Sequence, residues 1–162
     1  MEDLLYCRGF CLTNSTNNYL ESKFNKFYLD SCNIFYFHDW LDFSCYKKNN
    51  KEWVAIAGLC IDIKNKCSDL EVISQRAARL MSIGENYFHE YLDFLSGSFI
   101  LICKTNNELR FYTDACASRA SFYVYINDIF YVSSHLGLVS KVSNHDGSYS
   151  DQFLKKSSKV NY

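Results

Sequence analysis

Cysteine is the residue type in this chain whose number first points to chemistry. The 162 residues contain eight cysteines, at positions 7, 11, 32, 45, 60, 67, 103 and 116. A structural zinc site would need paired short spacings, and the Cys7-x3-Cys11 pair has no second pair to match it. Several of these cysteines, among them Cys60 and Cys103, lie inside apolar runs. We therefore expect reduced, buried thiols, with neither a metal nor a cofactor.

Charged and imidazole side chains are the next candidates for chemistry. Asp114 and Arg119 are five residues apart, across a turn between two predicted strands, and we expect them to pair and to fix that loop. The histidines stand alone, without a carboxylate or cysteine at a spacing that would make a catalytic pair. We expect each of them to be packed or exposed rather than catalytic: His38, His89, His135 and His145.

A run of strands must position these residues. Residues 95–134 predict four consecutive strands, at 99–103, 109–113, 121–126 and 129–133, the last two joined by a hairpin turn at Asn127 and Asp128. Upstream, the pattern predicts strands at 4–13, 24–29, 33–38, 41–46 and 53–63. Gly58, inside the last of these, marks a close backbone approach or a bulge. The strand at 129–133 is a candidate sheet edge that another chain could pair with.

Helical spacing is clear in one region, residues 68–89. Ser68 and Glu71 form a predicted capping box at its start, Gly84 ends its first part, and a second short helix is expected over 85–94. The polar residues 14–18 indicate a turn, and 136–142 a short helix or coil. Strands, then helices, then strands predict one α+β domain.

The overall composition is that of a folded chain with no electrostatic preference for a partner. It is 48% hydrophobic and 17% aromatic, which argues against disorder. A formal net charge of −1 gives no reason to expect nucleic acid or a membrane surface as partner. No signal peptide and no run of transmembrane length is found, so we expect a cytoplasmic protein.

Four short segments follow one another in an order and spacing that resemble the glutaminase half of asparagine synthetases. They are Leu95-Ser96-Gly97-Ser98-Phe99, Asp114-Ala115-Cys116-Ala117-Ser118-Arg119, Phe122-Tyr123 and Val132-Ser133-Ser134. An upstream block agrees, with Ala57-Gly58-Leu59 and Ser68-Asp69-Leu70-Glu71-Val72. That half belongs to the class II glutamine amidotransferases, which are N-terminal-nucleophile hydrolases. The resemblance covers residues 1–142 and leaves 143–162 as a polar tail.

The resemblance implies a fold and a set of site residues. The implied fold is an αββα sandwich of two antiparallel sheets, with one helical layer reduced because a single helical region is clear. In the family, an N-terminal cysteine attacks the glutamine side-chain amide, with its own amino group as base. Cys7 takes that place here if residues 1–6 are removed. Gly58 and Asp69 match ligand-binding positions, and the structural motif is carried by Gly97, Asp114, Arg119 and Tyr123.

Departures from the family pattern predict a domain without hydrolytic activity. Ala57 replaces the asparagine that supplies an oxyanion donor, and no arginine lies between Arg8 and Arg76, where the family has its carboxylate clamp. We expect an inactive binding or scaffold subunit, a pseudoenzyme, whose partner is an asparagine-synthetase-type ATP-dependent amide-forming enzyme. Two alternatives stay open. One is an active amidohydrolase that uses Cys7, and the other is a module that binds glutamine or another amino acid at Gly58 and Asp69.

Overall fold

The apolar runs of the sequence form two antiparallel sheets in the computed structural model, which describes residues 6–105 and 108–144. One sheet has the order β2-β3-β1-β9-β8, with β1 (Phe10–Thr13), β2 (Asn25–Tyr28), β3 (Ile34–Phe37), β8 (Phe122–Ile126) and β9 (Ile129–Ser133). The other has the order β4-β5-β6-β7, with β4 (Phe43–Asn49), β5 (Glu52–Asp62), β6 (Leu95–Thr105) and β7 (Glu108–Thr113).

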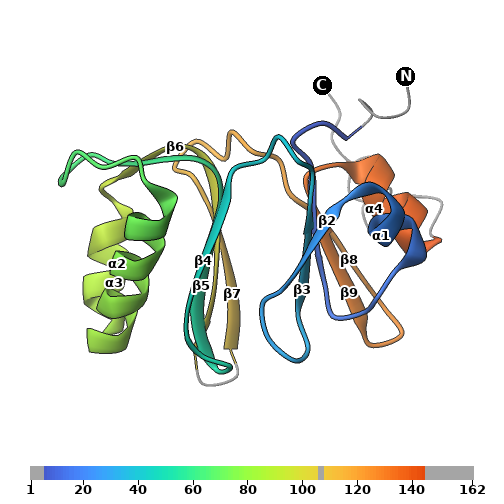
Figure 1. Ribbon diagram of the computed structural model, residues 1–162, viewed down its shortest axis with the longest axis horizontal. Coiled ribbons are helices and arrows are strands. Elements are labelled where there is room, and N and C mark those ends of the chain that lie inside the picture. The colour runs from blue at the N-terminus through green and yellow to red at the C-terminus, as the bar shows by residue number, and fades with distance from the viewer. Residues whose placement is uncertain (1–5, 106–107, 145–162) are drawn as a thin grey trace, which may run out of the picture.

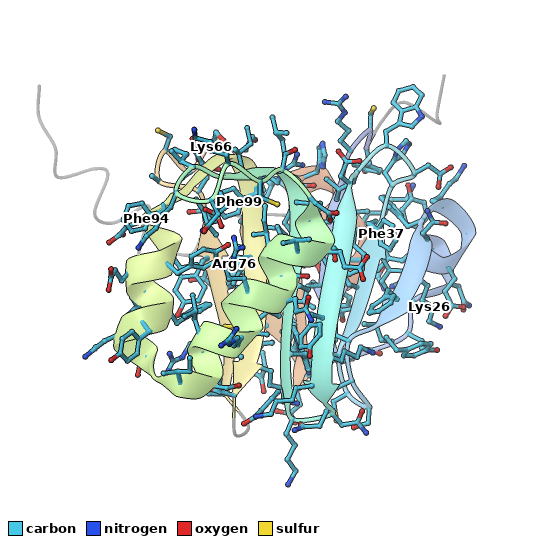
Figure 2. The ribbon with its side chains drawn as sticks, turned by 60° about the vertical axis from the view of Figure 1, so that its left-hand side comes forward. Lys26, Phe37, Lys66, Arg76, Phe94 and Phe99 are labelled. Atoms are coloured by element: carbon cyan, nitrogen blue, oxygen red, sulfur yellow. The ribbon has the colours of Figure 1, made fainter. Side chains whose placement is uncertain are left out.

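Helices cover the outer face of each sheet, as Figure 1 shows. The helices α2 (Leu70–Ile83) and α3 (Glu85–Leu92) pack on the four-stranded sheet, and α1 (Asn18–Lys23) with α4 (Leu136–Ser143) on the five-stranded sheet. The second helical layer is short. In Figure 2, Arg76 and Phe99 lie between the first layer and its sheet, while Lys26 and Phe37 belong to the other sheet.

Side-chain alternation explains why the central strands read as unbroken apolar runs. In β5, Trp53, Ala55 and Ala57 point into the space between the sheets, while Val54 and Ile56 point toward α2 and α3. A strand that is covered on both faces needs apolar residues at every position. The α+β class with two antiparallel sheets is therefore confirmed, and the cluster between the sheets contains Phe10, Leu12, Phe35, Leu41, Ile100 and Ile102 as well.

The N-terminal part differs from the sequence-based prediction in two places. The first strand begins at Phe10, because residues 6–8 form a turn closed by the Gly9 N–H on the Tyr6 carbonyl, at 2.8 Å. The polar stretch 14–18 leads into a helix. The Asn17 side chain accepts hydrogen bonds from the N–H groups of Tyr19 and Leu20 and so caps α1.

Two details elsewhere also needed correction. The N-cap of α2 is Asp69 and not Ser68, because the Asp69 carboxylate accepts from the N–H of Glu71 at 2.9 Å and from that of Val72. The strand β9 lies between β1 and β8, so β8 is the sheet edge. The hairpin at Asn127 and Asp128 is confirmed, with φ of 51° and 63°.

The helix ends agree with the prediction more closely than the strand ends do, since β6 begins at Leu95 instead of residue 99 and β4 ends at Asn49 instead of residue 46. Gly84 ends α2, its N–H donating to the Leu80 carbonyl, and α3 follows directly. Residues 136–143 are a helix rather than coil, and Asn144 caps it with a φ of 53°. The predicted tail beyond residue 144 lies outside the described residues. None of the described helices is long and apolar enough to cross a membrane.

Candidate functional site

Two neighbouring cavities open at the end of the sandwich where the chain crosses from β3 to β4 (Figure 1). The first, the Arg119 cavity, has a volume of about 320 Å³ and is lined by Arg8, Trp40, Leu41, Asp42, Gly58, Leu59, Ser98 and Arg119. The second, the Ser68 cavity, has about 360 Å³ and is lined by Asp42, Phe43, Gly58, Leu59, Cys60, Ser68 and Leu70. Asp42, Gly58 and Leu59 line both, so they form the wall that the two cavities share.

Gly58 lies in this shared wall at a position where no side chain would fit. Its φ is 103°, and a Cβ would lie 2.4 Å from the Ser98 carbonyl oxygen on β6. The same Cβ would lie 3.1 Å from Nε of Arg119. The close approach predicted at Gly58 is thus confirmed. Gly97 on β6 has a similar role, with a φ of 130° and the Leu59 carbonyl oxygen 2.2 Å from the position of a Cβ.

Arg119 lies against Gly58 with an incomplete set of hydrogen bonds. Its Nη1 donates to the carbonyl oxygen of Arg8 at 3.0 Å, whereas its Nε is buried and has no partner among the described residues. Burial lowers the pKa of Arg119, and the charge of Arg8 lowers it further, against an opposing contribution from Asp114. Arg8 itself has a left-handed φ of 55°.

Asp114 organises the loop before β8 through hydrogen bonds rather than through an ion pair. Its carboxylate accepts from the N–H of Cys116 at 3.1 Å and from the hydroxyl of Ser118 at 2.8 Å. Burial would raise the pKa of Asp114, but the bonds from Ser118 and Cys116 outweigh it and hold that pKa below its usual value. The expected Asp114–Arg119 pair was wrong: the Arg119 guanidinium points to Arg8 instead.

The predicted site residues lie in different places. Gly58 and Arg119 meet in the Arg119 cavity, and Gly97 supports the neighbouring strand pair. Asp69 is not among the described lining residues of either cavity, although its neighbours Ser68 and Leu70 line the second. Tyr123 lies apart from both, on the edge strand β8, and is 82% exposed.

Cys7 lies beside the cavity rather than in it. It is partly buried in the turn at residues 6–8, and its neighbour Arg8, not Cys7, belongs to the described lining of the Arg119 cavity. The eight cysteines are free thiols, but the expected burial holds only for Cys11, Cys60 and Cys103. Burial raises the pKa of Cys60 and Cys103 to about 12, so these two thiols stay protonated and unreactive. Cys32 and Cys116 are exposed, which the sequence did not indicate.

The side-chain oxyanion donor of the family pattern has no counterpart at Ala57, and the neighbouring N–H of Gly58 is already engaged. Ala57 is buried in the apolar cluster between the sheets and has no donor in its side chain. The N–H of Gly58 already donates to the carbonyl oxygen of Asp42, at 2.8 Å. Arg8 and Arg119 can hold a charged group in this cavity, but neither Ala57 nor Gly58 offers a free donor to a tetrahedral intermediate.

Among the described residues, the histidines and the acidic residues do not gather into a second site. His38 accepts from the N–H of Trp40, His89 lies 3.3 Å from the Tyr112 hydroxyl, and His135 lies 2.8 Å from that of Ser134. His145 lies outside the described residues. Over residues 6–105 and 108–144, no group of three or more His, Cys, Asp or Glu side chains is placed to hold a metal ion.

Sequence reasoning missed Arg8, Trp40 and Asp42 as lining residues. Trp40 falls between the strands predicted at 33–38 and 41–46, whereas Asp42 falls inside the second of them, which in the structure begins only at Phe43. No family model matches this chain, and neither a curated protein nor a solved structure matches it.

Proposed function

We propose that this chain is a glutaminase-like domain of the class II glutamine amidotransferase type that binds a partner and does not hydrolyse glutamine. Backbone conformation supports the resemblance. Gly58 and Gly97 occupy glycine positions of the motifs and both have positive φ, of 103° and 130°. Ala117 stands where the motif has its third glycine and keeps a φ of 47°, which an alanine rarely adopts.

The observation that carries the loss of hydrolysis is the hydrogen bond from the Gly58 N–H to the Asp42 carbonyl oxygen. Amide hydrolysis passes through a tetrahedral oxyanion, which needs donors already aimed at it. Ala57 is apolar where the family pattern has its side-chain donor, and the adjacent Gly58 N–H is engaged as well. The loss of one donor lowers the rate by about 10²–10³-fold, so with no replacement from Gly58 little catalysis is left.

The role as a binding subunit is supported by the edge of the five-stranded sheet. Strand β8 is an edge strand, and its Tyr123 and Tyr125 are 82% and 65% exposed. Edge strands carry unpaired backbone groups, and exposed aromatic side chains are enriched in protein interfaces. The partner that the resemblance implies is an asparagine-synthetase-type, ATP-dependent amide-forming domain, and glutamine or another amino acid is the corresponding small ligand.

An ammonia-release assay with glutamine tests the lack of hydrolysis. We expect no release above a protein-free control, and no difference between the wild type and Cys7→Ala. Cys32→Ala is the matched control, since Cys32 is an exposed thiol away from the cavity. Release at an enzyme-like rate that Cys7→Ala abolishes and Cys32→Ala retains would overturn the proposal.

A binding titration tests the partner. The probe is a purified synthetase domain of the asparagine-synthetase type that lacks its own glutaminase half. We expect saturable binding that is lost in the Tyr123→Ala, Tyr125→Ala double variant. Tyr87→Ala is the matched control, because Tyr87 is 57% exposed on α3, away from β8. Equal binding by both variants would exclude β8 as the interface.

One observation favours a second candidate function, an amidohydrolase that uses Cys7. Cys7 directly precedes Arg8 of the cavity, so cleavage after residue 6 would place a free amine near it. Such cleavage would remove Tyr6, whose ring lies 5.4 Å from His135 and whose carbonyl closes the turn to Gly9. The intact mass of the protein from its native host decides: a chain that starts at Cys7 supports this candidate.

A further inference from the structure

Arg119 is a partly buried charged residue with an incomplete set of hydrogen bonds. Its Nε is buried and has no partner there, and its one described acceptor is the Arg8 carbonyl oxygen, 3.0 Å from Nη1. A buried donor without an acceptor costs about 1–3 kcal/mol, and more when the group is charged. Because Arg119 also lines the cavity, its guanidinium can meet an acceptor that comes from outside the chain.

The charges around Arg119 also leave a positive excess. Arg8 lines the same cavity, and the two positive charges disfavour each other. Asp42 is the one carboxylate among the described lining residues, so these three side chains sum to one positive charge. Asp114 lies near Arg119, but its carboxylate is already engaged by Ser118 and Cys116.

The backbone of Gly58 and of Arg8 fixes the position of the Arg119 guanidinium, so this position does not depend on a bound ligand. A Cβ on Gly58 would lie 3.1 Å from Nε and 3.2 Å from Nη2 of Arg119, which means that the flat guanidinium rests on the glycine. The hydrogen bond to Arg8 holds its other side. A planar fork held in this way is suited to an oxyanion, because two parallel N–H groups match two oxygen atoms.

Trp40, Leu41 and Leu59 add apolar surface to the cavity wall. Trp40 is 59% exposed and Leu59 57% exposed, and both line the cavity. Exposed side chains of this size lose contact with water when a ligand covers them, which favours binding of an apolar group. The volume of about 320 Å³ is at the lower end of the range for small-molecule sites.

We propose that the Arg119 cavity binds a small organic acid, whose oxyanion lies between Arg8 and Arg119 and whose apolar part lies on Trp40 and Leu59. A carboxylate and a phosphate share the chemistry that this pair of guanidinium groups recognises. The proposal rests on the proposed function at one point, since Gly58 lines this cavity and is a ligand-binding position of the resemblance, whereas Cys7 and β8 are not among the described lining residues. A failure of acid binding would remove the small ligand but leave the lack of hydrolysis and the role of β8 standing, because ammonia release and partner binding measure those separately.

The test uses the full chain and three probes of matched length: hexanoate, hexyl phosphate and the neutral hexanamide. The chain has two tryptophans, of which Trp53 is fully buried and Trp40 lies at the cavity, so Trp40 emission reports binding. We expect a saturable change with hexanoate or hexyl phosphate and none with hexanamide. The tighter of the two acids identifies the oxyanion as carboxylate or phosphate. The signal should be absent in Trp40→Phe, while calorimetry still detects binding.

Variants then assign the binding to Arg119. Arg119→Gln should weaken the acid at least about tenfold, as expected for the loss of a charged hydrogen bond, and Arg79→Gln on α2 should not. If Arg119→Gln is not folded by circular dichroism, Arg8→Gln takes its place, with the same expectation. Equal binding of hexanamide, no binding of either acid, or unchanged affinity in the arginine variant overturns the proposal.

Discussion

Arg76 and Arg119 both place a guanidinium against strand β5, but only Arg76 meets a carboxylate there. Arg76 reaches from α2 toward the sheet (Figure 2), where its Nη1 pairs with the carboxylate of Asp62. That carboxylate is fully buried and also accepts from the Tyr91 hydroxyl at 2.8 Å and from the N–H of Asn65 at 2.9 Å. Arg119 meets a glycine and a carbonyl oxygen, and its Nε has no partner within the described residues.

The difference separates a charge that holds the fold from a charge that is available to a ligand. Around Asp62, acceptors and donors from β5, α2 and α3 are matched, so the cluster joins the helices to the sheet. Removing one partner of such a cluster leaves another buried and unpaired. Around Arg119 the mismatch already exists, so removing that side chain takes away little that stabilises the fold. The predictions below test this contrast, beginning with the largest expected effect.

Asp62→Asn should destabilise the fold by about 3 kcal/mol, because it leaves the Arg76 charge without its counter-charge. This value lies at the low end for a broken buried pair, since the Arg76 side chain is 34% exposed. Urea unfolding measures it. Asp93→Asn makes the same chemical change at an exposed position and should alter stability by less than about 0.5 kcal/mol. Equal effects of the two changes would mean that the Asp62–Arg76 pair does not stabilise the fold.

Gly58→Ala should cost about 2–3 kcal/mol, since alanine is strained at a φ of 103° and its Cβ would meet the Ser98 carbonyl oxygen at 2.4 Å. Gly84→Ala is the control, because its nearest neighbour would lie 3.6 Å away and its φ of 165° is ordinary extended backbone. The midpoint of thermal unfolding compares them. A tolerated alanine at 58 would mean that the guanidinium of Arg119 does not rest on this residue.

Asp30 is a second buried carboxylate whose hydrogen bonds are satisfied, and its contribution to stability should depend on pH. Burial would raise its pKa, but bonds from Asn33, Cys32, Lys104 and Trp53 outweigh this and lower the pKa from 3.8 to about 2. A carboxyl whose pKa is depressed in the folded state stabilises the fold above its unfolded pKa, and the benefit disappears as pH falls from about 4 to 2.

Asp30→Asn should therefore lower stability at pH 7 by about 2 kcal/mol, and the difference from the wild type should shrink toward pH 2. Urea unfolding followed by tryptophan emission measures this, because the Trp53 Nε1 donates to Asp30 at 3.0 Å. Asp39→Asn makes the same chemical change at an exposed position and should alter stability at pH 7 by less than about 0.5 kcal/mol. A constant difference across this pH range would contradict the assignment.

Arg119→Ala should change stability by less than about 1 kcal/mol, because the desolvation of an incompletely paired charge offsets its hydrogen bond to Arg8. Arg76→Ala is its counterpart and should cost about 2 kcal/mol, since Asp62 would remain buried without its counter-charge. Both are measured by urea unfolding at pH 7. If Arg119→Ala destabilises the fold more than Arg76→Ala does, then Arg119 stabilises the fold, and its incomplete hydrogen bonding no longer supports a ligand site in the cavity.

The strands could be predicted from the sequence because their burial leaves a continuous pattern. Strands β5 and β6 are apolar on both faces, and the hairpin between β8 and β9 needs residues that tolerate positive φ, which Asn127 and Asp128 do. Helix α1 left no such pattern. It has six residues and buries one of them, Leu20, so its cap at Asn17 was its only signal. A polar residue of this kind is equally typical of a turn.

The candidate site could be predicted in part. Gly58 was identified because a glycine inside an apolar strand usually marks a close approach of two backbones, and Arg119 because it follows a recognisable motif. The Asp114–Arg119 pair was wrong, because local spacing cannot show that Ser118 and Cys116 satisfy the carboxylate first. Arg8 and Trp40 were missed because nothing near them in the chain indicates a cavity built from segments more than 100 residues apart, as Arg8 and Arg119 are.

The sequence by itself determined which residues form strands, where the main helices end and which positions need glycine. These properties depend on neighbours in the chain and on whether a side chain must avoid water. Tertiary structure alone decided that β8 and not β9 is an edge of the five-stranded sheet, and that Arg119 meets Arg8 over Gly58. Such contacts join segments whose relative position is set by the packing of whole layers, and local sequence carries no record of it.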